Sequence, residues 1–405
     1  MNDGGGRRAA GGDAGPDAIG APHDERANER NRRWASTMDG HPGSGIRFAH
    51  VDSDARRGVG RSTARLDRPA REQLERERLW PGATLATGAG HREVPEEPDP
   101  WRTCFERDRD RILHDTSFRR LAGKTQVFVF PDDHQRTRLT HALEVAQVAT
   151  GVARACGLNV ALTEAIALGH DCGHGPGGHA SEDALSPYLD GGFDHAPWGA
   201  DVSLAPLNLC RETLDGIRNH SWSRPAPATP EGEVVSWADR IAYVCHDFED
   251  AVRSGIVTTD ALPALVRERC GDRRGHQLGT FIDALVTTVL ATGRIAMADD
   301  EAEALAAFRA SNYEHIYLRP NSVTQGRAVV AVLRALVEYF SDRPNLIPDG
   351  TGGNSALTGG EPAAIRAAVA YVAGMTDRFA FTRAVALLGW DPDKLPAGVG
   401  TSARF

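Results

Sequence analysis

Apolar residues recur every three to four positions along most of the chain after residue 95, which is the spacing of one face of an α-helix. In residues 137–157 this face includes His141 and Val145, and Gly157 marks the predicted end of the helix. The hydrophobic pattern therefore predicts a long amphipathic helix that carries a histidine on its apolar side.

Two further segments have the same period and also place polar side chains among apolar ones. Residues 159–171 bring Ile166 and His170 into register, and residues 232–255 place Asp239 between apolar positions of successive turns. We also predict helices over residues 259–269, 276–293, 300–310, 323–341, 362–379 and 380–389. The predicted elements are thus almost entirely helical.

The alternating pattern of a half-buried strand is scarce. The segment "TQVFVF" at residues 125–130 is the best short strand. Residues 342–361 are rich in Gly, Pro, Asn and Asp and are predicted to form a long loop. Because predicted helices dominate and predicted strands are scarce, the sequence predicts an all-α fold, a helical bundle.

The N-terminal part has a different composition. Residues 1–45 contain almost no large apolar side chains, so they cannot bury enough surface to offset the entropy of ordering. Residues 46–95 differ little, apart from a short charged helix predicted near 69–80. We therefore predict a largely disordered N-terminal region, 1–95, followed by one all-α domain, 96–405.

Composition narrows the class of protein. The 405 residues are 41% hydrophobic and carry a net charge of -9, which argues against a dedicated DNA-binding protein. Six cysteines without a CxxC pair suggest reduced thiols in a cytoplasmic protein. No apolar run is long enough to span a bilayer, so we expect no membrane association. The only lysines are Lys124 and Lys394, so arginine clusters are weak evidence of function here.

Three predicted helices each present a nitrogen or oxygen ligand on an apolar face. These are His141, His170 and Asp239, and Asp171 directly follows His170. A carboxylate that faces a core is costly unless it is paired or binds a cation, and the negative end of the second helix favours a cation there. Each histidine could instead be a hydrogen-bonded core residue. The convergence of the set favours a mixed N/O site for a divalent metal, namely Mn, Mg, Fe, Co or Zn.

Five ordered motifs resemble one known family. They are "RDRDRILHDTSFRRLAGKTQVF", "TRLTHALEVAQVA", "HDCGHGPGGH", "GGFDHAPWGAD" and "WADRIAYVCHDFEDA". Their order and spacing over about residues 105–255 are similar to those of the dGTPase-like deoxynucleoside triphosphate triphosphohydrolases, a branch of the HD-domain metal-dependent phosphohydrolases. The resemblance implies an HD core at about 136–255, a helical C-terminal part at 256–405, and cleavage of dNTPs to deoxynucleoside and inorganic triphosphate.

The resemblance also implies roles for residues near the metal site. The ligand set would be His141, His170, Asp171 and Asp239. A second histidine group with a supporting carboxylate would serve proton transfer: His174, His179, His195 and Glu182. By spacing alone, His195 could equally be an ordinary loop residue.

Substrate contacts are implied on two helices. Arg138 and Arg240 match residues that contact the phosphates, whereas Tyr243 and Asp247 match residues that meet the sugar and its 3′-hydroxyl. Tyr243 could alternatively be an aromatic that packs between helices. These four residues would hold the dNTP against the metal.

Three more positions belong to or border the motifs. Lys124 is expected near the site, Arg119 is a position without an assigned role, and His134 is expected in a surface turn. Many family members read "HDLGHPPFGH" where this chain has Cys172 and "GPGG", so we expect a different pocket wall beside His179.

Two alternatives to dNTP hydrolysis stay open. One is an HD phosphatase acting on nucleoside monophosphates or signalling nucleotides. The other is a non-catalytic module that binds nucleotides or single-stranded nucleic acid. The expected partners are the dNTP substrate, an allosteric dNTP or single-stranded nucleic acid, and further copies of the chain in a homo-oligomer.

Overall fold

A computed structural model describes residues 21–37, 40–50, 65–131, 134–348 and 357–396. The chain divides into two compact units, Met1–Arg65 and Leu66–Phe405, which are described separately. The first contains helix α1 (Ala21–Thr37) and the antiparallel pair β1 (His41–Pro42) and β2 (Arg47–Phe48). The described side chains of α1 are almost all exposed, as expected for a segment without apolar anchors.

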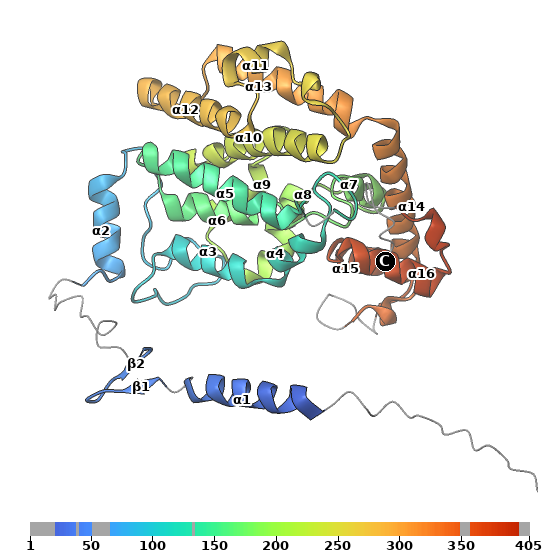
Figure 1. The fold of residues 1–405 in the computed structure, drawn as a ribbon, viewed down its shortest axis with the longest axis horizontal. Coiled ribbons are helices and arrows are strands. Elements are labelled where there is room, and N and C mark those ends of the chain that lie inside the picture. The colour runs from blue at the N-terminus through green and yellow to red at the C-terminus, as the bar shows by residue number, and fades with distance from the viewer. Residues whose placement is uncertain (1–20, 38–39, 51–64, 132–133, 349–356, 397–405) are drawn as a thin grey trace, which may run out of the picture. The chain divides into compact units, whose positions relative to one another are not determined.

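The second unit is helical, and the prediction of an all-α fold is confirmed (Figure 1). Its first helices are α2 (Arg68–Arg78), α3 (Cys104–His114), α4 (Thr116–Arg120), α5 (Arg138–Ala155), α6 (Val160–Gly169), α7 (Ala180–Leu185), α8 (His195–Trp198), α9 (Arg211–Asn219) and α10 (Pro230–Arg253). The later ones are α11 (Ala264–Cys270), α12 (Arg274–Thr292), α13 (Asp299–Asn312), α14 (Pro320–Asp342), α15 (Pro362–Ala373) and α16 (Asp377–Leu388).

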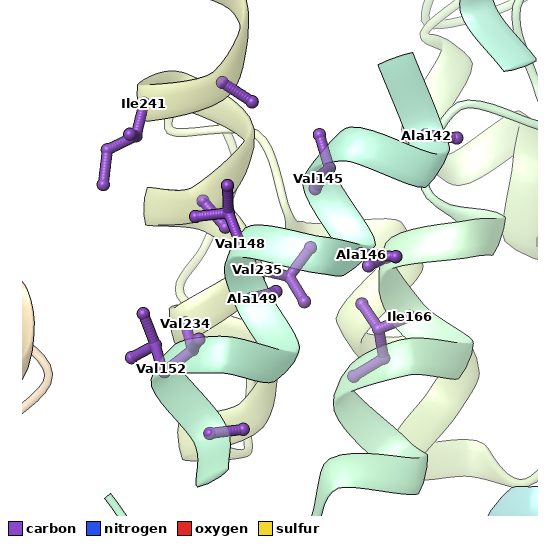
Figure 2. Close-up of a cluster of buried hydrophobic side chains, with 14 of the residues drawn as sticks. Ala142, Val145, Ala146, Val148, Ala149, Val152, Ile166, Val234, Val235 and Ile241 are labelled. Atoms are coloured by element: carbon purple, nitrogen blue, oxygen red, sulfur yellow. The ribbon is translucent and has the colours of Figure 1, made fainter. Parts of the chain in front are cut away.

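The core that supports the site lies between α5, α6 and α10. Figure 2 shows Val145 and Val148 of α5 in one cluster with Ile166 of α6 and Val235 of α10. These side chains are at most 1% exposed, so each contributes on the order of 1.5–3 kcal/mol through the hydrophobic effect. The three helices that were predicted to carry metal ligands are therefore packed directly against one another.

Local sequence explains where α5 begins and ends. Thr137 caps its N-terminus through a reciprocal capping box with Thr140. After Ala155 the chain turns at Gly157, whose φ of +61° is left-handed. A Cβ at Gly157 would lie 2.5 Å from Cδ1 of Trp80, so this glycine also permits close packing.

The helical unit begins at Leu66, earlier than the predicted boundary at residue 96. Helix α2 confirms the charged helix, and the chain after it packs on the domain through polar contacts. Thr84 N donates to Glu231 at 3.0 Å, and Arg92 forms a buried ion pair with Asp108 at 2.7 Å. Because hydrogen bonds and a buried ion pair hold this segment, its hydrophobic pattern did not reveal the packing.

The strand predicted over residues 125–130 is wrong. Thr125 forms an isolated antiparallel bridge with Thr137, and the rest of the segment is bends. Phe128 and Val129 are both buried but in different hydrophobic clusters, so their alternation reflects two packing partners rather than a sheet.

The C-terminal helices form two groups (Figure 1). Helices α12 and α13 pack on α10 and α11 packs on both of them, whereas α14, α15 and α16 form a second cluster against α7. The single helix predicted over residues 362–379 is divided, because α15 ends at Ala373 and α16 begins at Asp377. All six cysteines are free and buried. Among the described helices, none has the length and hydropathy required to span a bilayer.

Candidate active site

One cavity of about 1030 Å³ opens between the core around α5 and α10 and the C-terminal helices. It is lined from α5, α7, α8, α10 and the segment after α9 on one side and from α13, α14 and the turn between them on the other. The predicted site residues that line it are Arg138, His141, Asp171, His174, His179, Glu182, His195, Asp239, Arg240, Tyr243 and Asp247. The remaining one, His170, lies buried beside them.

The four predicted metal ligands form one cluster. Nε2 of His141 on α5 lies 3.0 Å from Oδ1 of Asp239 on α10. Nε2 of His170, which follows α6, lies 3.8 Å from the same oxygen and 3.5 Å from Oδ1 of Asp171. Three helices thus bring nitrogen and oxygen donors together within the span of a single cation.

The hydrogen bonding of His170 fits a metal ligand. Its Nδ1 lies 2.7 Å from the carbonyl of Ala167 and donates to it, so the Nε2 lone pair faces the cluster. That Nε2 is buried without a hydrogen-bond partner among the described residues. Burial opposes the charged form of Asp239, but His141 and His170 outweigh it and hold the pKa of this carboxyl below its usual range. These donors could hold a divalent metal.

Arg138, the first residue of α5, borders the cluster and lines the cavity. NH1 donates to Oδ2 of Asp171 at 2.7 Å. Burial favours the neutral acid, but Arg138 and His170 lower the pKa of Asp171 well below its usual value. Nε and NH2 of Arg138 are buried and have no partner among the described residues. Buried guanidinium donors left in this way are typical of a site for an anion.

A second histidine group lies beside the first. The rings of His174 and His195 stack with centroids 3.7 Å apart, and the ring of His179 is 5.0 Å from that of His174. Glu182 of α7 lies with Oε1 2.5 Å from Nδ1 of His195 and also accepts from the His195 backbone N–H at 3.1 Å. Within this group His195 contacts Glu182, whereas Nε2 of His174 lies 3.2 Å from Oδ1 of Asp171.

His220 completes the group and was missed from the sequence. It is 2% exposed, its Nδ1 donates to the carbonyl of Ile217 at 2.8 Å, and its Nε2 lies 3.3 Å from Nε2 of His195. Burial lowers the pKa of His220 to about 3, so its Nε2 is an acceptor, and His195, which faces this acceptor and the Glu182 carboxylate, is suited to carry a proton on both ring nitrogens. Burial opposes this charge, but Glu182 outweighs burial and raises the pKa of His195. The only sequence signal for His220 was its place directly after a short helix, α9, which the hydrophobic pattern did not predict.

The far end of the cavity combines α10 with the C-terminal helices. Tyr317 donates to Oδ2 of Asp247 at 2.5 Å, and Nε of Arg309 donates to the hydroxyl of Tyr243 at 2.7 Å. Burial raises the pKa of Asp247 to about 7, although the Tyr317 hydrogen bond opposes this. Arg309 and Tyr317 were also missed, because they follow residue 255, where the resemblance ended.

Two further cavity residues escaped the sequence prediction. Trp222 lies with its ring 3.6 Å from the guanidinium carbon of Arg240 and donates from Nε1 to the Ser236 carbonyl at 3.2 Å. Nε of Arg240 and Oε1 of Gln126 are buried without partners among the described residues. Gln126 belongs to the "GKTQV" motif, which offered the only sequence signal for it.

The remaining predicted positions lie outside the cavity. Lys124 is 3% exposed and donates from Nζ to the carbonyl of His174, so it contacts the site from behind. Arg119 is exposed and does not line the cavity. His134 is exposed in a turn, as predicted.

Two family models match the chain. The HD domain matches residues 138–244, which contain the His/Asp cluster and the second histidine group. The phosphohydrolase-associated domain matches residues 295–385, which contribute Arg309 and Tyr317. A solved phosphohydrolase structure from Bacteroides thetaiotaomicron is similar to the chain with a TM-score of 0.43 and 17% identity over 67% of each chain.

Curated relatives match most of the chain. The deoxyguanosinetriphosphate triphosphohydrolase-like protein of Caldanaerobacter subterraneus subsp. tengcongensis is 40% identical over 319 residues, covering 77% of this chain and 93% of that protein. The protein of the same description from Clostridium perfringens strain 13 is 39% identical over 324 residues, covering 76% and 93%. The chain therefore belongs to the deoxyguanosinetriphosphate triphosphohydrolase-like family of HD-domain phosphohydrolases.

Proposed function

We propose that this protein hydrolyses deoxynucleoside triphosphates to deoxynucleoside and inorganic triphosphate with the help of a divalent metal. The observation that carries the proposal is the set of unpaired, buried guanidinium donors of Arg138 and Arg240, which face the cavity that holds the His/Asp cluster. Buried donors of this kind, beside metal ligands, suit a polyphosphate.

The metal would be held by His141, His170, Asp171 and Asp239. A divalent cation bound there polarises a phosphoryl oxygen. Asp171 also accepts from Arg138, so the same carboxylate joins the metal ligands to a phosphate-binding guanidinium. This shared carboxylate would fix the position of the reacting phosphate relative to the metal ligands.

The two ends of the cavity suit the two ends of the substrate. Arg138 and Arg240 would contact the phosphates. Tyr243 and Asp247 lie one and two helical turns after Asp239, and they would meet the sugar and accept from its 3′-hydroxyl. A cavity that continues from the arginines to this polar end favours a nucleotide over a small phosphate ester.

The histidine group would transfer protons. Water attacks the α-phosphorus, the bond between that phosphorus and the 5′-oxygen breaks, and the 5′-oxygen gains a proton. The imidazolium of His195, which Glu182 holds through Nδ1, would donate that proton from Nε2 by giving up its contact with His220. His174 and His179 would complete the route by which protons reach and leave this group.

The test is a screen of the purified protein against all four dNTPs, with triphosphate and phosphate release measured separately. In water enriched in ¹⁸O, the label should appear in the triphosphate and not in the deoxynucleoside. Sequential release of single phosphates would replace the proposal by a general HD phosphatase. Nucleotide binding without turnover would favour the non-catalytic module.

A variant separates proton transfer from metal binding. His195→Ala should slow the reaction by about 10²–10⁴-fold if the histidine donates a proton, with bound metal unchanged because His195 is not among the proposed ligands. Loss of metal in this variant would contradict the assignment. The homo-oligomer, the allosteric dNTP or single-stranded nucleic acid, and the cytoplasmic location stay predictions.

A further inference from the structure

The loop that carries His174 and His179 has little regular structure of its own. Within it, Gly175 N donates to Oγ of Ser181 at 3.0 Å, and that hydroxyl donates to the carbonyl of Gly178 at 2.6 Å. The backbone is left-handed at Gly177 and Gly178, with φ of +72° and +62°. A loop with two such glycines has many accessible conformations, so other contacts must hold its histidines in place.

Asp377 supplies one of these contacts from a distant part of the chain. It is the first residue of α16 and is 3% exposed. Its Oδ1 accepts from the Gly177 backbone N–H at 2.8 Å. Its Oδ2 accepts from Thr125, both from the backbone N–H at 2.9 Å and from the hydroxyl at 2.5 Å. One buried carboxylate thus joins the histidine loop to the segment before α5.

Lys124 supplies a second contact. Its Nζ donates to the carbonyl of His174 and, at 3.1 Å, to the carbonyl of Ala373 at the end of α15. Burial disfavours the ammonium group and lowers the pKa of Lys124 to about 8. The ammonium therefore connects the same loop to the same C-terminal helices as Asp377, and it lies on the side of the loop away from the cavity.

Helix α14 contacts the loop beside the cavity. A Cβ at Gly177 would lie 2.4 Å from Cγ1 of Val329, which is fully buried on α14. The backbone at Gly177 is therefore in direct contact with the C-terminal cluster. This contact limits movement of the loop toward α14.

We propose that Asp377 and Lys124 are positioning residues that hold the backbone of residues 174–177, and with it the imidazoles of His174 and His179, in their orientation toward the cluster around Asp171. The phosphohydrolase-associated region would thereby act on the catalytic loop from behind, in addition to lining the cavity. The effect on turnover rests on the proposed function, whereas the effect on the loop does not.

The variant Asp377→Asn tests this without creating a cavity. Asparagine has one acceptor oxygen in place of two, and that oxygen satisfies more donors when it faces Thr125. Its NH₂ group then faces the Gly177 N–H, where a donor meets a donor. The variant should therefore lose the contact to the loop and keep the contact to the segment before α5.

Asp108→Asn is the matched control. Asp108 is buried on α3, and its Oδ2 accepts from the Cys210 backbone N–H at 2.8 Å and from the Thr213 hydroxyl at 2.7 Å. Its Oδ1 also pairs with Arg92, so the substitution costs at least as much stability as in Asp377→Asn. It does not line the cavity. It therefore reports what global destabilisation alone does.

The first readout is steady-state kinetics of the metal-loaded protein on a dNTP that the wild type hydrolyses. Since misplacing a catalytic group by about 1 Å can cost 10²-fold, we expect kcat of Asp377→Asn to fall about 10- to 100-fold. KM should change less than about threefold, and metal content should stay equal. Asp108→Asn should retain kcat at a temperature where it is folded. An equal fall in both variants, or none in Asp377→Asn, would overturn the proposal.

The second readout needs no activity. Hydrogen–deuterium exchange of peptides that cover residues 172–181 should be faster in Asp377→Asn than in the wild type and unchanged in Asp108→Asn. If the wild type hydrolyses no dNTP, the proposed function fails while this measurement still decides the role of Asp377. Should Asp377→Asn not fold, Lys124→Met replaces it with the same expectations, and unchanged exchange in that variant would refute the inference.

Discussion

Replacing Glu182 by Gln isolates the interaction that keeps His195 protonated. The carboxylate lies 2.5 Å from Nδ1 of His195, and this pairing lowers the pKa of Glu182 from 4.5 to about 2 against the opposing effect of burial. That change corresponds to about 3 kcal/mol, since each tenfold change in the acid constant is worth about 1.36 kcal/mol. The Glu182 side chain is 27% exposed, so solvent screening reduces the part of this energy that favours the charged His195.

The side-chain amide in Glu182→Gln still accepts a hydrogen bond but carries no charge. We therefore expect the pKa of His195 to fall, because the charge that favours its imidazolium form is removed. The imidazolium is present below its pKa, so activity is lost as pH rises through that value. In this variant the alkaline limb of the kcat profile should move to lower pH by the same amount. At pH values on the alkaline limb, kcat of the variant should be about 10- to 100-fold below that of the wild type. At lower pH the two profiles should converge.

The assay is kcat for deoxynucleoside release, measured across pH at saturating dNTP and fixed metal. Glu231→Gln is the matched control, since Glu231 is fully buried and accepts from the Thr84 and Asn159 backbone N–H groups at 3.0 and 2.9 Å. It should lower the melting temperature without moving the limb. A uniform loss at every pH in Glu182→Gln, with the limb in place, would refute the role assigned to His195 and Glu182.

Three other results are expected. Asp239→Ala should abolish stoichiometric metal in elemental analysis, because it removes an oxygen that lies 3.0 Å from Nε2 of His141 and 3.8 Å from Nε2 of His170; retained metal would contradict the ligand set. Deleting residues 1–45 should leave turnover and melting temperature unchanged, since this segment lacks apolar anchors, and a clearly lower melting temperature would show that it packs on the domain. Trp222→Ala should raise KM about 3- to 30-fold with little effect on kcat, since stacking on Arg240 contributes on the order of 1–2 kcal/mol; an unchanged KM would exclude that role.

The helices that carry the metal cluster could be predicted because their signal is local. The 3.6-residue period records which side of each helix is buried, so His141, His170 and Asp239 stood out as polar groups at apolar positions. Each candidate ligand could be recognised from a short stretch of chain. The convergence of the three side chains depends on how α5, α6 and α10 pack against one another.

Segments held by polar contacts could not be predicted in this way. The chain after α2 has few apolar residues. It packs on the domain through the contacts of Thr84 with Glu231 and of Arg92 with Asp108, and both partners are distant in the sequence. The segment at 125–130 was predicted as a strand, yet its two buried apolar side chains, Phe128 and Val129, belong to different clusters. Periodicity shows that a residue is buried and leaves open what it is buried against.

The sequence by itself determined the helical class, the three ligand helices and the histidines of the loop. Only the tertiary structure decided which residues complete the site. His220 meets His195 across 25 residues, Tyr317 meets Asp247 across 70, and Asp377 meets Gly177 across 200. Hydrogen bonds between such distant groups form only when the packing of whole helices brings donor and acceptor together. No local pattern of residues specifies that geometry.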